Sequence, residues 1–258
     1  MNDTPRPAHY ALAATVILMR EVSDGPPELL MLERASTMAF AAGALVFPGG
    51  RVEESDWALA DALTDQYALD RQEMAQRIAG IRETVEEVGV APGIVPAPDD
   101  STIAMVRQGL IDGRSFDALL EASGLRLVLD ALAPFARWCP PEDAPRRFDT
   151  RFFLAAAPAD AIETADGSES VHALWSTARA LLQDAEAGHH RLIFPTWCTI
   201  DRLAQFSSLE EARADGARHA HNLAFGRVEQ RDGVDWLCVE EGIGYPTTAR
   251  LLGDDFRH

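Results

Sequence analysis

One stretch predicts a helix that carries clustered carboxylates and ends at a glycine. It reads Arg82-Glu83-Thr84-Val85-Glu86-Glu87-Val88-Gly89-Val90. Residues three and four apart are neighbours on a helix surface, so Glu83 lies beside both Glu86 and Glu87. Arg82 can neutralise only part of their charge. A divalent cation of the Mg²⁺ or Mn²⁺ type prefers oxygen ligands and would supply the rest. The stretch therefore favours a metal site, although taken alone it also fits a solvated acidic helix face with a glycine cap.

A second informative stretch lies upstream. The residues Gly43-Ala44-Leu45-Val46-Phe47-Pro48-Gly49-Gly50-Arg51-Val52-Glu53 form an apolar, strand-like run that breaks at the Pro-Gly-Gly sequence. Glycine adopts positive φ at little cost and lets the backbone approach a ligand closely. A strand, a glycine loop and an acidic helix are the parts of a phosphate and metal site.

Together the two stretches resemble the box of the Nudix hydrolases, which reads Gly, five residues, Glu, seven residues, then Arg-Glu-apolar-x-Glu-Glu-x-Gly-apolar. Gly50 takes the glycine position, Asp56 falls where the first Glu is expected, and residues 82–90 fill the second half. Thr84 stands where the family usually carries an apolar residue. Residues 57–81 make a spacer of 25 residues where the family has seven, so the box is interrupted.

An interrupted box beginning Phe-Pro-Gly-Gly-Arg-Val resembles the Nudix subgroup typified by the peroxisomal coenzyme A diphosphatase and its bacterial relatives. The segments 30–35, 136–138 and 145–154 also resemble that subgroup, together with Met38 and Phe40. The resemblance implies an α/β protein of the α+β type with the Nudix fold, in which a mixed β-sheet is sandwiched between helices.

The resemblance also implies metal-dependent hydrolysis of a pyrophosphate bond in a nucleoside diphosphate derivative, with Mg²⁺ or Mn²⁺ as the cofactor. We expect Glu83 and Glu87 to be the principal metal ligands. Glu86 would complete the coordination or position the attacking water, which needs either a metal or a carboxylate to take its proton. We expect the catalytic residues to be Glu86, Glu87 and Arg82, with Arg82 orienting a box carboxylate.

The expected substrate is coenzyme A or acyl-coenzyme A, with 3′,5′-ADP and (acyl-)phosphopantetheine as products. Gly49 and Gly50 would let the backbone approach the diphosphate. Arginine is suited to the 3′-phosphate of coenzyme A, because guanidinium binds phosphate through two hydrogen bonds. The candidate arginines are Arg34, Arg51, Arg146 and Arg147, each of which also fits an ordinary surface role. Trp138 and Trp197 fit core packing better than base stacking.

Two other functions stay open. One is a Nudix pyrophosphatase of ADP-ribose or another dinucleotide. The other, from a different class, is a non-catalytic nucleotide-binding or regulatory module on a Nudix scaffold. The intact acids Glu83, Glu86 and Glu87 argue against a non-catalytic module. Asp56 in place of Glu and the long insertion are the two features that remain compatible with one.

Length and composition fit a globular protein of 258 residues, 47% of them hydrophobic. We expect one domain over residues 1–258, a helical insertion at 57–80 within the box, a second at about 101–130, and a C-terminal helical and hairpin extension at about 206–258. Apolar and turn patterns predict secondary structure along the chain. The expected strands are 11–22, 29–33, 134–139 and 151–157, the expected hairpin is 227–239, and the further expected helices are 177–187, 195–206 and 209–218.

The net charge of −18 disfavours a nucleic-acid partner, because an acidic surface repels phosphate backbones. Small anionic substrates stay compatible with that charge, since a metal and a few arginines can reverse the field within one cleft. The three cysteines fit no disulfide framework and are expected to be buried. No run of 18 apolar residues or signal-peptide pattern is found, so we expect a cytoplasmic protein without membrane contact. A homodimer is an expectation by analogy only.

Overall fold

The computed structural model describes residues 10–35, 41–142, 144, 146–158, 161, 170–219 and 222–252. Met38, Phe40 and Pro145 of the motifs above lie outside these ranges. The strands of the main sheet are β1 (Ala11–Arg20), β2 (Glu28–Arg34), β3 (Ala44–Val46), β4 (Gly49–Arg51), β7 (Ala133–Cys139), β8 (Phe148–Ala156), β9 (Ser170–Thr177), β10 (Arg191–Leu192) and β11 (Leu223–Phe225). The helices are α1 (Glu54–Leu63), α2 (Arg71–Val88), α3 (Asp100–Ile111), α4 (Phe116–Ala122), α5 (Ala178–Glu186), α6 (Phe194–Leu203) and α7 (Leu209–His219), with 3-10 turns η1 (Thr64–Gln66) and η2 (Leu129–Ala131).

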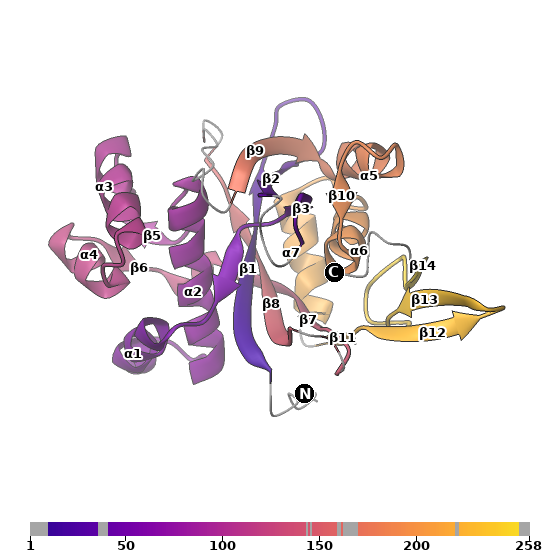
Figure 1. Cartoon of the computed structure of the whole chain (residues 1–258). Coiled ribbons are helices and arrows are strands. Elements are labelled where there is room, and N and C mark those ends of the chain that lie inside the picture. Colours follow the sequence, from indigo (N-terminus) through magenta and orange to yellow (C-terminus); the bar gives the residue numbers. More distant parts are fainter. Residues whose placement is uncertain are drawn as a thin grey trace.

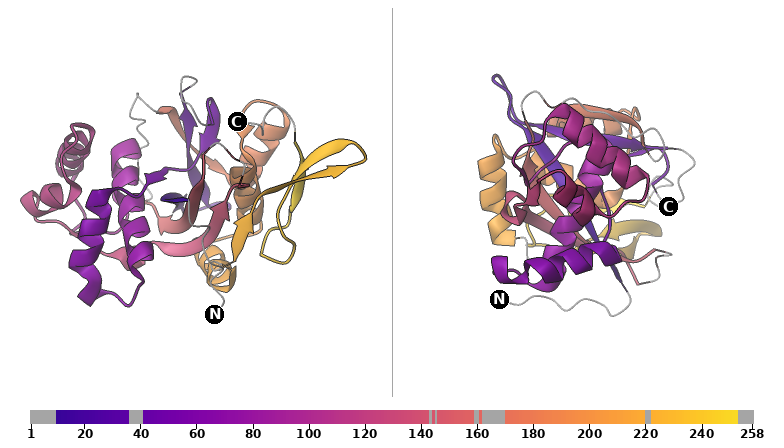
Figure 2. Two further views of the ribbon diagram at one scale, coloured as in Figure 1. Left: turned by 60° about the horizontal axis from the view of Figure 1, so that its bottom comes forward. Right: turned by 90° about the vertical axis from the view of Figure 1, so that its left-hand side faces the viewer.

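The main sheet is mixed and lies between two layers of helices (Figures 1 and 2), with α1 to α4 on one side and α5 to α7 on the other. Its strand order is β10-β3-β2-β1-β8-β7-β11, with β4 paired to β1 and β9 paired to β2. β1 runs parallel to β8 along its length, whereas β1 pairs antiparallel with β2 and β4. The expected mixed sheet between helices is confirmed.

The central strand β1 supplies both cores, because side chains alternate across a strand. Val16 and Leu18 belong to the apolar cluster on the side of α2, while Ile17 and Met19 belong to the cluster on the side of α6 and α7. All four side chains are buried. The strand therefore joins the two helical layers into one structure.

Helix α2 carries the acidic stretch, and its sequence explains its position. Apolar residues recur at helical spacing and are all buried against the sheet; they are Met74, Ile78, Ile81, Val85 and Val88. The helix begins after Asp70, whose carboxylate accepts from the Glu73 N–H at 2.8 Å. It ends at Gly89, which has φ of 66°. The helix thus starts within the inserted residues and continues into the box.

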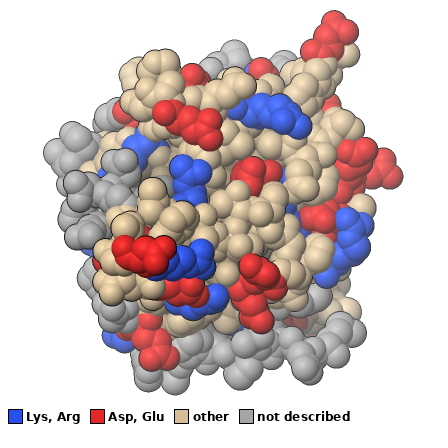
Figure 3. Space-filling view, turned by 90° about the vertical axis from the view of Figure 1, so that its right-hand side faces the viewer, with Lys and Arg blue, Asp and Glu red and all other residues tan. Residues whose placement is uncertain are grey.

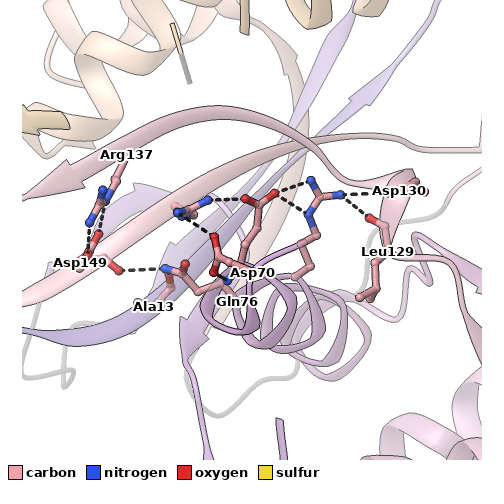
Figure 4. Close-up of polar contacts among 10 residues, drawn as sticks. Ala13, Asp70, Gln76, Leu129, Asp130, Arg137 and Asp149 are labelled. Carbon is pink, nitrogen blue, oxygen red and sulfur yellow. Dashed lines mark hydrogen bonds and ion pairs between the residues drawn. The ribbon is translucent and has the colours of Figure 1, made fainter. Parts of the chain in front are cut away.

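Polar contacts fasten the N-terminal half of α2 to the sheet (Figure 4). The Gln76 amide donates to the carbonyl oxygens of Ala13 on β1, at 2.9 Å, and Asp149 on β8, at 3.2 Å. Glu73 forms a buried ion pair with Arg77 at 2.6 Å and also pairs with Arg151 of β8 at 2.6 Å. The helix is therefore fixed to both parallel strands.

The C-terminal region forms a second, three-stranded sheet of β12 (Arg227–Arg231), β13 (Val234–Cys238) and β14 (Ala249–Leu251). β12 and β13 form the expected hairpin, which projects from the body of the molecule (Figure 1). A third small sheet pairs β5 (Ile94–Val95) with β6 (Arg126–Leu127). Acidic and basic side chains are scattered over the face formed by α5, α6 and the C-terminal sheet of β12 to β14 (Figure 3). Within the described residues, no helix combines the length and apolar character needed to cross a bilayer.

Candidate active site

The glycine loop and the acidic helix meet at the edge of β1. β4 lies antiparallel to β1, with Gly49 opposite Thr15 and Gly50 opposite Ala14. A Cβ placed on Gly50 would come within 2.3 Å of the Glu83 carboxylate. A Cβ on Gly49 would come within 2.2 Å of the Ala14 carbonyl oxygen. A side chain at Gly49 would collide with the sheet backbone and one at Gly50 would displace the Glu83 carboxylate, so the glycines let the backbone lie directly against the first acid of the helix.

Arg82 connects the two halves of the interrupted box. Its guanidinium forms two hydrogen bonds to Asp56, at 3.0 and 2.9 Å, and donates to the Glu83 carboxylate at 2.9 Å. It also donates to the Arg51 carbonyl oxygen at 3.0 Å. Asp56 is buried and accepts from the Glu53 N–H at the start of α1. The acid at the first Glu position is thus held in place by Arg82.

The acids of the helix have different surroundings. Burial raises the pKa of Glu83 to about 7; the charge of Arg82 opposes this rise and the charge of Glu86 adds to it. The Glu86 side chain is 32% exposed and lies 3.9 Å from the Arg82 guanidinium. Glu87 is buried, and its carboxylate accepts from the Gly49 N–H at 2.9 Å. Of the three acids, Glu86 is therefore the most exposed, Glu83 is mostly buried, and Glu87 holds the glycine loop.

A cleft of about 810 Å³ is lined by part of this group, namely Gly49, Gly50, Arg82, Glu83 and Glu86, together with Glu53. Its other lining residues include Trp138, Cys139 and Pro140 at the end of β7, Phe148 and Phe152 of β8, and Ile193 and Pro195 at the start of α6. The cleft therefore has both charged and apolar lining residues.

Three of the four candidate arginines lie in this cleft. Arg34 from β2, Arg51 from β4 and the exposed Arg146 before β8 all line it. Arg147 does not; it donates to the Glu142 carbonyl oxygen at 3.4 Å. Trp138 lies in the cleft wall and packs against Phe194 and Tyr245, as core packing requires. The three cysteines are buried, as expected.

Two features of the cleft were missed by sequence reasoning. Glu53 lines it, and its place directly after the Gly-Gly-Arg-Val run was the available signal. Phe148, Thr150 and Phe152 also line it. They alternate along β8, so they share one face of the strand, but their role depends on the pairing of β8 with β1, which local sequence does not specify.

The chain is similar to proteins of one family. An acyl-coenzyme A diphosphatase of Gallus gallus is 28% identical, over 80% of this chain and 71% of that protein. An acyl-coenzyme A diphosphatase of Homo sapiens is 26% identical, over 91% of this chain and 77% of that protein. A Nudix hydrolase from Alicyclobacillus acidocaldarius has a crystal structure that matches with a TM-score of 0.69 and 28% identity, over 80% of this chain and 96% of that one. The chain has the Nudix fold and is similar in sequence to Nudix hydrolases. No family model matches it.

Nudix hydrolases generally use divalent metal ions, and the donor atoms at the acidic end of α2 fit such an ion. In the described part of the chain, no three His, Cys, Asp or Glu side chains gather into a ready-made metal cage. Mg²⁺ does not need one, because it commonly binds through one or two carboxylates, waters and substrate phosphates. Glu83 and Glu86 offer hard oxygen donors beside the glycine loop, and the raised pKa of Glu83 reflects a burial that a cation would offset.

Proposed function

We propose that this protein cleaves the pyrophosphate bond of coenzyme A or acyl-coenzyme A, releasing 3′,5′-ADP and (acyl-)phosphopantetheine. The observation that carries the proposal is the single cleft in which the carboxylates, the Gly-Gly backbone and three arginines come together. The similarity to two acyl-coenzyme A diphosphatases supports the same substrate class.

In the proposed reaction, a water oxygen forms a bond to one phosphorus and the bond from that phosphorus to the bridging oxygen breaks. The bridging oxygen leaves with the other phosphate, so each product carries a phosphate monoester. Glu86, at the cleft surface, or Glu87 beside it would accept the proton of the water. The bridge from Arg82 to Asp56 would keep the Glu83 carboxylate in place.

Glu83 and Glu86 would bind Mg²⁺ or Mn²⁺ directly, and Glu87, whose carboxylate accepts from the Gly49 N–H, would be the third carboxylate beside the ion. When bound, this ion neutralises charge on the pyrophosphate oxygens and lowers the pKa of the attacking water. Gly49 and Gly50 would let the diphosphate approach the main chain. Glu87 would assist them, because its contact with the Gly49 N–H ties the loop to the helix.

Substrate choice would depend on the cations of the cleft. Within the described residues, Arg51 and Arg146 both line the cleft, are exposed and form no ion pair or side-chain hydrogen bond. Arg51 directly follows Gly50, beside the proposed diphosphate site, so Arg146 is the arginine proposed for the 3′-phosphate. The apolar wall formed by Trp138, Phe148 and Phe152 would contact uncharged parts of the substrate.

The test is a product assay with Mg²⁺ or Mn²⁺, in which coenzyme A, 3′-dephospho-coenzyme A, ADP-ribose and diadenosine compounds are each offered to the wild type and to Glu87→Gln. We expect only the wild type to cleave, with coenzyme A preferred and dephospho-coenzyme A clearly poorer. Arg146→Gln should narrow that preference, whereas Arg147→Gln, outside the cleft, is the matched control. Preference for ADP-ribose or a dinucleotide would replace the proposed substrate, and no turnover with either metal would refute the proposed reaction.

A further inference from the structure

The acidic turn of α2 lies at an unfavourable end of its helix. The C-terminus of a helix carries partial negative charge, so carboxylates there are repelled by the helix dipole as well as by one another. Glu86 and Glu87 lie in this last turn, which holds no basic residue of its own. The last carbonyl oxygens of a helix also have no partner within it. The turn with the proposed metal ligands therefore needs a cation and hydrogen-bond donors from elsewhere.

Arg107 of α3 supplies both. Its guanidinium donates from Nε to the Glu86 carbonyl oxygen and from Nη2 to the Glu87 carbonyl oxygen, each at 2.8 Å. The Val85 carbonyl oxygen accepts from the Gly89 N–H at 3.0 Å. A planar guanidinium fork can span two successive carbonyl groups, which the point charge of lysine cannot do equally well.

The position of Arg107 is set by the packing of α3 against α2. Its neighbours Val106 and Leu110 are buried in the same apolar cluster as Val85 and Val88. The Arg107 side chain is partly buried and donates to the main chain that carries the acids. These two bonds act on the direction of the Glu86 and Glu87 side chains through the backbone.

We propose that Arg107 is a positioning residue of the active site, which holds the last turn of α2 in the geometry that binds metal and substrate. The helical segment that contains α3 thereby becomes part of the catalytic apparatus. This inference rests on the proposed metal site. Partners that orient metal ligands typically affect metal affinity or activity by about 10- to 100-fold.

The experiment measures Mn²⁺ binding to metal-free protein by electron paramagnetic resonance, together with kcat and the melting temperature. Arg107→Gln should weaken Mn²⁺ binding about tenfold and lower kcat, and Arg107→Lys should recover part of both. Arg114→Gln is the matched control, because Arg114 is an exposed arginine directly after α3. Wild-type Mn²⁺ affinity in Arg107→Gln would overturn the inference. If that variant does not fold, Arg107→Lys decides: weakened Mn²⁺ binding supports the inference, and unchanged binding overturns it.

Glu87→Gln separates this inference from the proposed function. Weaker Mn²⁺ binding in Glu87→Gln with no change in Arg107→Gln would refute only the role of Arg107. Equal Mn²⁺ binding by the wild type and Glu87→Gln would refute the proposed metal site itself.

Discussion

Two adjacent glycines differ in what an added methyl group would meet. At Gly50 it would meet the end of the flexible Glu83 side chain, at 2.3 Å, whereas at Gly49 it would meet the Ala14 backbone, at 2.2 Å. A side-chain end can move aside and a sheet backbone cannot. We therefore expect Gly50→Ala to fold normally but to lose about 10- to 100-fold in kcat, because Glu83 is displaced. Gly49→Ala should lose about 1–3 kcal/mol of unfolding free energy.

Urea denaturation and steady-state kinetics on both variants check this contrast. Gly226→Ala is the control, because its added methyl group would lie 3.4 Å from Pro141, at an ordinary contact distance. Full activity in Gly50→Ala would show that the close approach to Glu83 has no catalytic importance.

The pKa of Glu83 makes a second prediction at the residue scale. This pKa is raised from 4.5 to about 7, mainly by burial, so between these values the folded protein binds a proton that the unfolded chain does not. The resulting stability is present below pH 4.5 and is lost as the pH rises through 7. In metal-free protein, Glu83→Gln should remove this dependence. Between pH 5 and pH 8 the wild type should lose about 2.5 kcal/mol more unfolding free energy than the variant. Urea denaturation in EDTA measures the difference, and parallel curves would contradict it.

At the scale of elements, the attachment of α2 to the sheet depends on the hydrogen bonds of Gln76. Its side chain is buried and serves two carbonyl oxygens on two strands. Gln76→Leu would leave both without this donor, so we expect a loss of about 2 kcal/mol in unfolding free energy. Gln108→Leu is the comparison, since Gln108 bonds only to Asp112 at the surface and its loss should stay within about 0.5 kcal/mol. If chemical denaturation shows equal losses of unfolding free energy in Gln76→Leu and Gln108→Leu, the Gln76 hydrogen bonds do not stabilise the attachment of α2 to the sheet.

The sequence predicts those elements whose determining residues lie close together in the chain. The C-terminal half of α2 is predictable, because its apolar spacing, its acids and Gly89 lie within one stretch. The hairpin of β12 and β13 is predictable from Asp232-Gly233 at its turn. The bond from Arg107 to the box spans 20 residues and depends on the packing of two helices, so no local pattern contains it. The short strands β10 and β14 were missed for a similar reason, because they exist only through pairing with distant partners.

The candidate site shows the same limit. Gly49, Gly50 and the acids of α2 follow from motifs. The motifs do not predict which arginines line the cleft. Arg146 and Arg147 are neighbours in sequence, yet of the two only Arg146 lines it.

At the scale of the whole molecule, the C-terminal region reaches the active-site wall. Tyr245 is buried and packs edge-on against Trp138, with ring centroids 5.0 Å apart, and Trp138 lines the cleft. Tyr245→Ala should cost about 3–5 kcal/mol of stability and raise KM, because the support behind Trp138 is lost. Tyr245→Phe is the control. This variant keeps the ring that packs against Trp138, so its KM should match that of the wild type. An unchanged KM in a folded Tyr245→Ala protein would separate this region from the cleft.

Helix α2 is continuous from Arg71 to Val88, and this continuity allows the number of residues ahead of it to vary. The extra residues enter before and within the first turns of the helix, while Gly50 meets Glu83 across the edge of the sheet. Loop length ahead of Asp70 can therefore drift over evolutionary time without moving the catalytic turn. A recognition rule that counts the residues between Gly50 and Arg82 rejects chains of this kind. A rule that seeks the Gly-Gly pair and the Arg82 to Gly89 turn separately accepts them.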